Sequence, residues 1–221
     1  MLNKDCGVTG GLYGENYIKG DVVLLKLLIK KFQLTIEEPQ CIMIFSNAGD
    51  KKQDVLGILN GKVKGVEGQY FLKGKDVSTF SQREMAHLRK KEVINFSDTN
   101  FLMEGYTVEK NLQLQLKTSG IYPTKGKRMI GATLDLLDLK DFRDLPITQL
   151  SLLQKLLVRL AKAAVVEPKI ICGQDPFVDL NEKEIKIVKG WIENLTAKGI
   201  IVIMITENLN HLKYGDQEII L

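Results

Sequence analysis

The chain has 221 residues, enough for one domain with a subdomain. Its 44% of hydrophobic and 26% of charged residues are typical of a globular protein with a sizeable core, and they exclude a disordered or collagenous chain. The 31 basic and 27 acidic residues give a net charge of +4, too small and too scattered an excess to indicate a nucleic-acid-binding surface.

The cysteines and the apolar runs indicate a reduced, non-membrane environment. Cys6, Cys41 and Cys172 lie far apart and lack the spacing of metal ligands, so we expect free thiols and no metal site. No apolar run reaches the roughly 18 residues that span a bilayer. We therefore expect a cytoplasmic protein that reaches the inner face of the cell membrane only through a partner.

Apolar, β-branched runs predict four buried strands. They are Cys41 to Phe45, Val93 to Phe96, Lys169 to Cys172 and Ile200 to Ile205. The first strand precedes a polar loop, Ser46 to Asp54, and a short helix, Val55 to Leu59.

The middle of the chain differs in residue pattern from the segments on either side. Glycines divide residues 61–74 into short strands and turns, and the charged run 83–92 predicts a solvated helix. Residues 98–148 read as a mostly helical insertion, with helical patterns at Thr107 to Leu116 and Thr133 to Leu139.

The last third predicts a βαβ unit. Leu150 to Val166 is a helix, and the second helix, Asn181 to Lys198, lies between two of the predicted strands and ends before Gly199. Such alternation predicts an α/β domain whose parallel sheet is covered on both faces. Functional groups of such sheets gather at the carboxyl ends of the strands.

The loop after the first strand occupies the place of a phosphate-binding P-loop. In the pattern G-x-x-x-x-G-K-[ST], Lys52 stands at the lysine position, but Ser46 and Lys51 replace the two glycines. Gln53 replaces the hydroxyl that ligates magnesium. Asp54 would repel phosphate from the start of the following helix. Taken alone, the loop reads as an ordinary turn.

Four segments resemble, in order, motifs of the ATP-binding subunit of ABC transporters, most closely those of the lipoprotein-release and macrolide-export type. Residues 149–164 (QLSLLQKLLVRLAKAA) are similar to the signature segment QLSGGQQQRVAIARAL, and residues 168–181 (PKIICGQDPFVDLN) to PKIILADEPTGNLD. Residues 105–112 (GYTVEKNL) resemble LTVxEN, and residues 202–208 (VIMITEN) resemble VIMVTHD.

The resemblance implies a P-loop NTPase (RecA-like) α/β core with a mostly parallel sheet, a small antiparallel β subdomain and an inserted helical subdomain. It implies one ABC ATPase-like domain over residues 1–221. Within it, residues 1–96 and 165–221 would form the nucleotide-binding-type core, and residues 97–164 the helical subdomain and signature helix.

For ATP itself, the resemblance implies contacts near the start of the chain and in the phosphate loop. Tyr17 would stack on adenine, although Tyr13 fits almost as well and both also fit tyrosines that anchor loops. The phosphate loop would contribute Ser46, Gly49, Lys52 and Gln53.

The positions that handle magnesium and water have changed. The magnesium-sensing glutamine falls on Ser97, and the Walker B aspartate on Gln174, whose neutral amide is a poorer ligand for a hard dication. The catalytic glutamate falls on Asp175, whose shorter side chain leaves its oxygen roughly 1 to 1.5 Å from the required place. The switch histidine falls on Glu207, an anion that would face phosphate.

The signature has changed as well. Ser151 and Gln154 remain, but Leu152 and Leu153 replace two glycines that let a helix N-terminus approach nucleotide held by the partner subunit. The D-loop aspartate falls on Asn181. Outside these motifs, His87, His211 and the lysines are expected at the surface.

Together, the resemblance and its departures predict a degenerate, non-hydrolysing ATP-binding subunit, a pseudoenzyme with a structural or regulatory role in a membrane transport complex. No cofactor is expected, with ATP and Mg²⁺ bound weakly at most, and the partners would be a membrane permease, a second ABC ATPase subunit or both. The alternative is a weakly active ATPase that binds ATP through Lys52 and Asp175 with a competent partner. A third reading is a soluble module that binds another ligand or protein.

Overall fold

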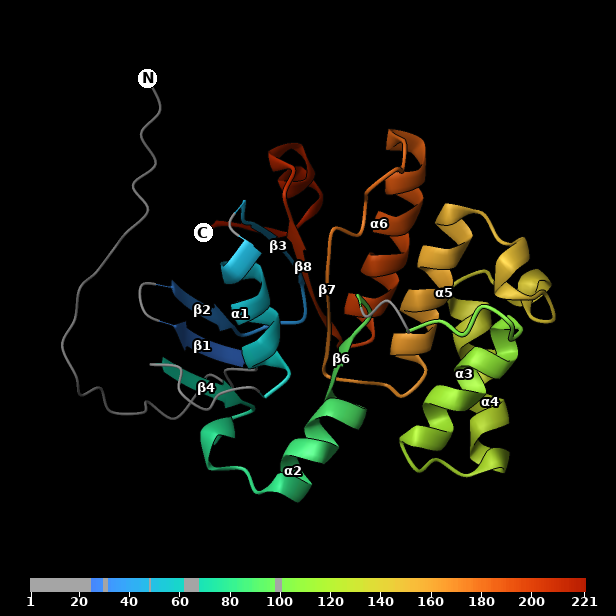
Figure 1. The fold of residues 1–221 in the computed structure, drawn as a ribbon, viewed down its shortest axis with the longest axis horizontal. Coiled ribbons are helices and arrows are strands. Elements are labelled where there is room, and N and C mark those ends of the chain that lie inside the picture. The colour runs from blue at the N-terminus through green and yellow to red at the C-terminus, as the bar shows by residue number, and fades with distance from the viewer. Residues whose placement is uncertain (1–24, 30–31, 48, 62–67, 98–100) are drawn as a thin grey trace.

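The structure, a computed structural model, describes residues 25–29, 32–47, 49–61, 68–97 and 101–221. A parallel sheet forms its centre, with an antiparallel sheet on one side and helices on the other (Figure 1). None of the helices within these ranges is long and apolar enough to cross a membrane.

The parallel sheet has the strand order β6-β7-β8-β3-β9, and each neighbouring pair is parallel. Its strands are β3 (Cys41–Phe45), β6 (Val93–Asn95), β7 (Ile170–Gln174), β8 (Ile201–Thr206) and β9 (Gln217–Ile220). The first four confirm the predicted strands to within two residues at each end. β9 lies at the sheet edge and is only half buried, which is why its short sequence carries no strong strand signal.

The antiparallel sheet has the order β2-β1-β4-β5 and confirms the expected β subdomain. Its strands are β1 (Leu25–Ile29), β2 (Phe32–Ile36), β4 (Gly68–Leu72) and β5 (Lys75–Asp76). Alternate residues of β1 and β2, among them Leu25, Leu27, Leu34 and Ile36, are buried against the rest of the domain.

The inserted segment is helical, as expected. Its helices are α3 (Val108–Thr118) and α4 (Pro123–Leu136), and they pack beside α5 (Leu152–Ala164) and α6 (Glu182–Ala197). The prediction of a helix over Thr133 to Leu139 is wrong at both ends. α4 starts at Pro123, where proline suits the first helical turn, and the glycines at 126 and 131 obscure its apolar pattern.

The helix after β3 also differs from the prediction. α1 spans Gly49–Leu59, so it begins six residues before Val55. Asp54 is therefore the sixth residue of the helix and is exposed, so it does not act on phosphate from the helix start. The charged run 83–92 forms α2 (Gln82–His87) and then a wider helical turn, Leu88–Glu92.

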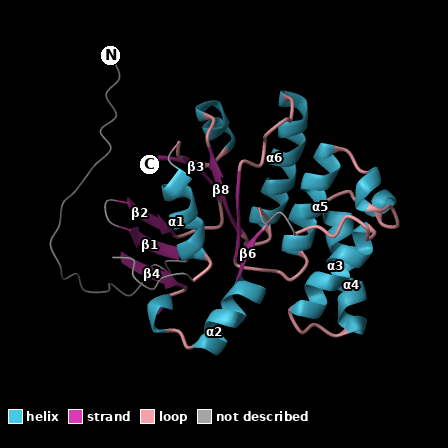
Figure 2. Cartoon of the chain, viewed as in Figure 1, coloured by secondary structure: helices cyan, strands magenta, loops and turns pink. Residues whose placement is uncertain are grey.

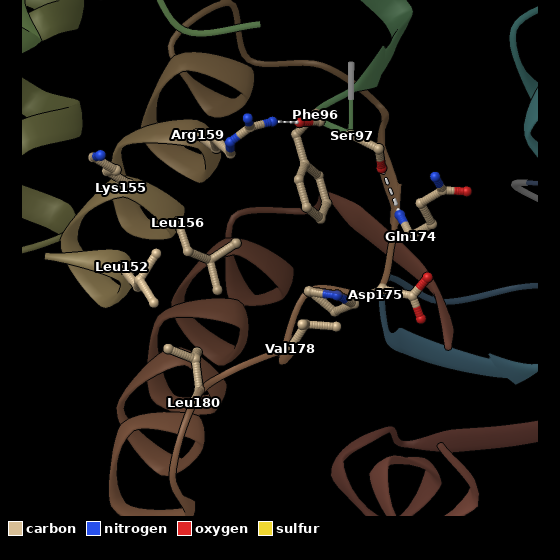
Figure 3. A pocket seen from close by; sticks show the side chains of 11 residues that line it. Phe96, Ser97, Leu152, Lys155, Leu156, Arg159, Gln174, Asp175, Val178 and Leu180 are labelled. Carbon is tan, nitrogen blue, oxygen red and sulfur yellow. Dashed lines mark hydrogen bonds between the residues drawn. The ribbon is translucent and has the colours of Figure 1, made fainter. Parts of the chain in front are cut away.

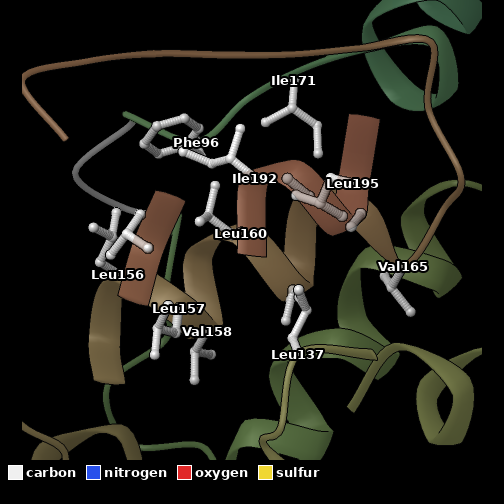
Figure 4. Packing of buried hydrophobic residues seen from close by; sticks show 14 of the residues in the cluster. Phe96, Leu137, Leu156, Leu157, Val158, Leu160, Val165, Ile171, Ile192 and Leu195 are labelled. Atoms are coloured by element: carbon white, nitrogen blue, oxygen red, sulfur yellow. The ribbon is translucent and has the colours of Figure 1, made fainter. Parts of the chain in front are cut away.

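The core has two halves, one on each face of the parallel sheet. Met43, Ile171 and Met204 face α3, α5 and α6, whereas their neighbours Ile44 and Cys172 face α1 and the antiparallel sheet. Figures 2 and 4 show the helices over the first face and the side chains packed beneath them. Both faces are thus covered, as the near-continuous apolar strands predict.

Candidate functional site

The carboxyl ends of three neighbouring strands bring the predicted site positions to one edge of the sheet. Ser46 follows β3, Asp175 follows β7 and Glu207 follows β8. The Ser46 N–H donates to the Thr206 carbonyl at 3.0 Å, and the Asp175 N–H donates to the Ile205 carbonyl at 2.7 Å. This edge is where α/β sheets hold their ligands.

The phosphate-loop positions are placed only in part. Gly49 is the first residue of α1, and Lys52 and Gln53 lie in its first turns, so all three stand at the N-terminal end of a helix that follows a strand. The candidate adenine-stacking residues, Tyr13 and Tyr17, lie outside the described residues.

A cavity of about 370 Å³ lies between α5 and the ends of β6 and β7 (Figure 3). Three predicted site residues, Ser97, Gln174 and Asp175, line it, and Leu152 comes from the opposite wall. The other lining residues are Phe96, Lys155, Leu156, Arg159, Pro176, Val178 and Leu180.

Ser97 and Gln174 are joined to each other. The Gln174 N–H donates to the Ser97 hydroxyl oxygen at 2.5 Å, and the Ser97 N–H donates to the Asn95 side-chain oxygen at 2.9 Å. In Figure 3 the Gln174 amide points to the side away from α5. The serine hydroxyl at the magnesium-sensing position thus accepts a bond from the backbone of the Walker B position.

Asp175 holds the loop that follows β8. One of its carboxylate oxygens accepts from the Glu207 N–H at 3.0 Å, and the backbone of Asp175 is left-handed, with a φ of 46°. A residue other than glycine adopts this conformation at a cost of about 1 kcal/mol, and aspartate is among those that tolerate it best. The two positions that would handle the attacking water and the γ-phosphate are therefore bonded to each other.

Two residues at the start of α5 cap the helix. Ser151 is the N-cap: its hydroxyl accepts from the Gln154 N–H at 3.2 Å, while the Gln154 side chain accepts from the Ser151 N–H at 2.8 Å. This capping box satisfies the Gln154 N–H, one of the groups that a helix N-terminus would otherwise offer to an anion. Leu152 stands beside it with 60% of its surface exposed.

Asn181, at the D-loop aspartate position, has a similar capping role. Its side-chain oxygen accepts from the N–H groups of Lys183 and Glu184 at 3.0 and 3.1 Å, which starts α6. Just before it, Val178 is 56% exposed on the same side as Leu152. This end of the site therefore presents apolar side chains.

Gly173 leaves room for the Phe96 ring, which lines the cavity. A Cβ on Gly173 would lie 2.4 Å from the Phe96 ring, so only glycine permits this packing. The ring closes the cavity floor between β6 and β7 (Figure 3).

Two basic residues of α5 bind the chain that follows β6, and the sequence analysis missed both. Arg159 donates to the Phe96 carbonyl at 2.7 Å, and Lys162 donates to the Phe101 carbonyl with its ammonium 4.9 Å from the centre of the Phe101 ring. Lys162 is only 4% exposed, so the expectation that the lysines are solvated is wrong here. Their spacing of three residues on one helix face was the available signal.

The burial of Lys162 predicts a pH-dependent stability. Burial, and then the charge of Arg159, lowers the pKa of Lys162 from 10.5 to about 8. Between these values the unfolded chain binds more protons than the folded one, so the destabilisation due to this lysine is relieved as the pH rises. We expect the free energy of unfolding of the wild type to rise, relative to that of Lys162→Met, between about pH 8 and 10.5 in denaturant titrations. A difference that is constant with pH would contradict this.

His211 is half-buried, whereas His87 is exposed as expected. The Asn208 amide donates to His211 Nε2 at 3.2 Å, so Nδ1 carries the proton and donates to the Thr206 hydroxyl at 3.2 Å. Burial lowers the pKa of His211, the charge of Asp175 opposes this, and that of Lys213 adds to it. A neutral His211 thus ties down the loop after β8.

Two of the three cysteines lie within the described residues. Cys41 and Cys172 are buried free thiols, and Cys6 lies outside the described residues. Burial raises the pKa of each buried thiol to about 12. Within the described part of the chain, no three His, Cys, Asp or Glu side chains gather in the manner of a metal site.

Comparison with known proteins identifies the family. The ABC transporter family matches residues 29–178, which is more than half of the chain. An uncharacterised ABC transporter ATP-binding protein of Methanocaldococcus jannaschii is 29% identical over 202 residues, covering 91% of this chain and 89% of its own. A macrolide export ATP-binding/permease protein of a Shewanella species is 26% identical over 86% of this chain, which corresponds to 29% of its own length.

Solved structures agree on the fold. A dimeric ATP-binding cassette with bound ADP and phosphate superimposes with a TM-score of 0.74 at 21% identity, covering 89% of this chain and 94% of its own. A subunit of the cbiONQ ABC transporter complex from Clostridium perfringens gives a TM-score of 0.79 at 19% identity, covering 91% and 85%. The chain therefore belongs to the ABC transporter family, as an ATP-binding domain with the P-loop NTPase fold.

Proposed function

We propose that this protein is a degenerate ATP-binding subunit that does not hydrolyse ATP and that has a structural or regulatory role in a membrane transport complex. The observation that carries the proposal is that the polar groups at the catalytic positions bond to one another. Ser97 accepts from the Gln174 backbone, and Asp175 accepts from the Glu207 backbone.

The residues at the magnesium positions fit the ion poorly. Mg²⁺ prefers charged carboxylate oxygens and water in near-octahedral geometry, whereas Gln174 offers a neutral amide. The Ser97 hydroxyl is short and is already hydrogen-bonded to the chain. Such a set does not offer the ligands through which magnesium would act in catalysis.

The signature end of the domain supports the same proposal. In the family, this helix start approaches the γ-phosphate of nucleotide held by a second subunit. Here Leu152, with 60% of its surface exposed, projects beside the helix start. A leucine at this point excludes the close backbone approach that phosphate needs.

The descriptions of one relative and one similar structure indicate the kind of partner to expect. The Shewanella relative is named as a joint ATP-binding and permease protein, and the Clostridium structure is described as part of a transporter complex. We propose that this chain likewise works with a membrane permease, a second ATPase subunit or both. It would then lie at the inner face of the membrane through its partner.

The alternative is a weakly active ATPase. The Asp175 carboxylate still lies at the sheet edge, and Lys52 stands in the first turns of α1, where a P-loop lysine would be. In that case a competent partner would supply the missing contacts.

Association behaviour separates these possibilities. We expect the sedimentation coefficient of the purified chain, alone and mixed with a co-encoded ATPase, to be the same with and without Mg-ATP. The reason is that neither half-site can hold nucleotide between two subunits. An intact ATP-binding subunit of the family, run in parallel, should dimerise only with nucleotide and shows that the conditions are suitable. A nucleotide-dependent dimer of this chain would support the alternative.

A further inference from the structure

A second cavity lies at the opposite, amino-terminal edge of the parallel sheet. Glu92 and Lys169 precede β6 and β7 there and are joined by a bond of 2.9 Å from the Lys169 N–H to the Glu92 carbonyl. The cavity measures about 340 Å³, is open to solvent on one side, and is bordered by this edge, by α2 and by the turn between β4 and β5. This side of the domain is away from the site described above (Figure 1).

The lining of this cavity combines an apolar wall with cations. Leu72 and Leu88 are buried, and Phe80 packs with them. Lys73 and Lys169 border the cavity together with Lys75. Lys73, Lys169 and Leu72 also line an adjoining cavity of about 300 Å³. The two lysine side chains therefore lie between the two cavities.

The backbone of Lys73, at the border of this cavity, has a strained conformation. Leu72 pairs with Lys75, so Lys73 and Gly74 alone form the hairpin loop. Both have positive φ, 50° and 74°, as in a type I′ turn. Such turns prefer Asn, Asp or Gly at the first position, and lysine is strained there.

Lys73 also faces a like charge. Burial, then contact with the Lys169 side chain, lowers the pKa of Lys73, and the charge of Glu92 acts in the opposite direction. Lysines in contact repel each other unless an anion lies between them. A bound anion would offset this repulsion.

Glu84 and Glu92 also line the cavity, and each carboxylate has another partner. Glu84 accepts from the backbone and the hydroxyl of Ser81 at 2.8 and 2.7 Å, which lowers the pKa of its carboxyl group. The Glu92 carboxylate lies 3.4 Å from His87 Nε2. Glu37 borders only the adjoining cavity.

We propose that Lys73 and Lys169 bind the phosphate or carboxylate group of a small amphipathic anion, whose short apolar part lies against Leu72, Phe80 and Leu88. The ligand class is thus an alkyl or aryl phosphate or carboxylate of a few carbons. The site is separate from the nucleotide positions and does not depend on whether ATP is bound.

The test is a titration of the full chain with hexyl phosphate and with hexanoate at constant ionic strength, followed by calorimetry and by the NMR shifts of residues 72–75. Hexanol is the neutral matched probe, and vesicles that contain phosphatidic acid are a separate arm. We expect both anions to bind, hexanol to bind at least tenfold more weakly, and Lys169→Gln to weaken anion binding by about tenfold or more.

Lys73→Asn separates a binding role from a structural one. Asparagine suits the turn, so this variant should be more stable than the wild type without ligand, yet it should lose anion binding by about tenfold or more. Lys117→Ala, which removes one exposed charge on α3, is the matched control and should bind as the wild type does. Equal binding by Lys73→Asn, no binding by the wild type, or binding to vesicles alone would overturn the proposal.

Discussion

The purified chain should turn over Mg-ATP at least ~10³-fold more slowly than an intact ATP-binding subunit of the family, measured by phosphate release. A metal ligand and the geometry of the catalytic carboxylate are lost together, and each loss removes transition-state stabilisation. Asp175→Asn should leave the residual rate unchanged, because the Asp175 carboxylate accepts from the Glu207 N–H.

Restoring only the signature is the sharpest control for this prediction. Leu152→Gly combined with Leu153→Gly reopens the helix start but leaves Gln53 and Gln174 in place. We expect no gain in turnover. If the double variant hydrolysed ATP at an appreciable rate, the signature would be the only defect and the account of the metal positions would be wrong. Turnover by the wild type that Asp175→Asn abolished would establish the weakly active enzyme instead.

Leu160→Ala should lower the free energy of unfolding by about 2–5 kcal/mol. Leu160 is fully buried on α5, where the helix packs between the parallel sheet and the inserted helices (Figure 4). Removing its side-chain carbons leaves a cavity that a close-packed core cannot fill completely. Urea or thermal unfolding monitored by circular dichroism gives the difference.

The matched control lies on the same helix. Leu152→Ala makes the same chemical change at a position that is 60% exposed, so its effect should stay within about 0.5 kcal/mol. A comparable loss at both positions would mean that the loss does not depend on burial, because alanine forms helices at least as well as leucine. That result would contradict the packing described here.

The sequence predicts the parallel sheet well because its strands are short, apolar and buried on both faces. β3 and β8 pair along their whole length, from Cys41 with Val202 to Phe45 with Thr206, and every residue of β8 is buried. In this setting composition alone is a strong signal. The N-terminal limits of α1 and α4 were wrong because glycine, proline and clustered charges at those ends look like loop residues.

The positions of the candidate site were predicted from motif resemblance, but their bonding was not. Ser97 and Gln174 are 77 residues apart, and Asp175 and Glu207 are 32 apart. Each bond joins a side chain to a backbone N–H, so residue types do not specify the pairing. The burial of Lys162 depends equally on where the segment after β6 crosses α5.

Calorimetric titration of the purified full chain with ATP, with and without Mg²⁺, tests the central claim most directly. Gln53, Ser97 and Gln174 stand where the family holds the metal, so we expect an affinity far weaker than micromolar and no dependence on Mg²⁺. An intact ATP-binding subunit of the family, titrated in the same buffers, sets the reference. Low-micromolar affinity that requires Mg²⁺ would contradict the account and show a nucleotide site that still works.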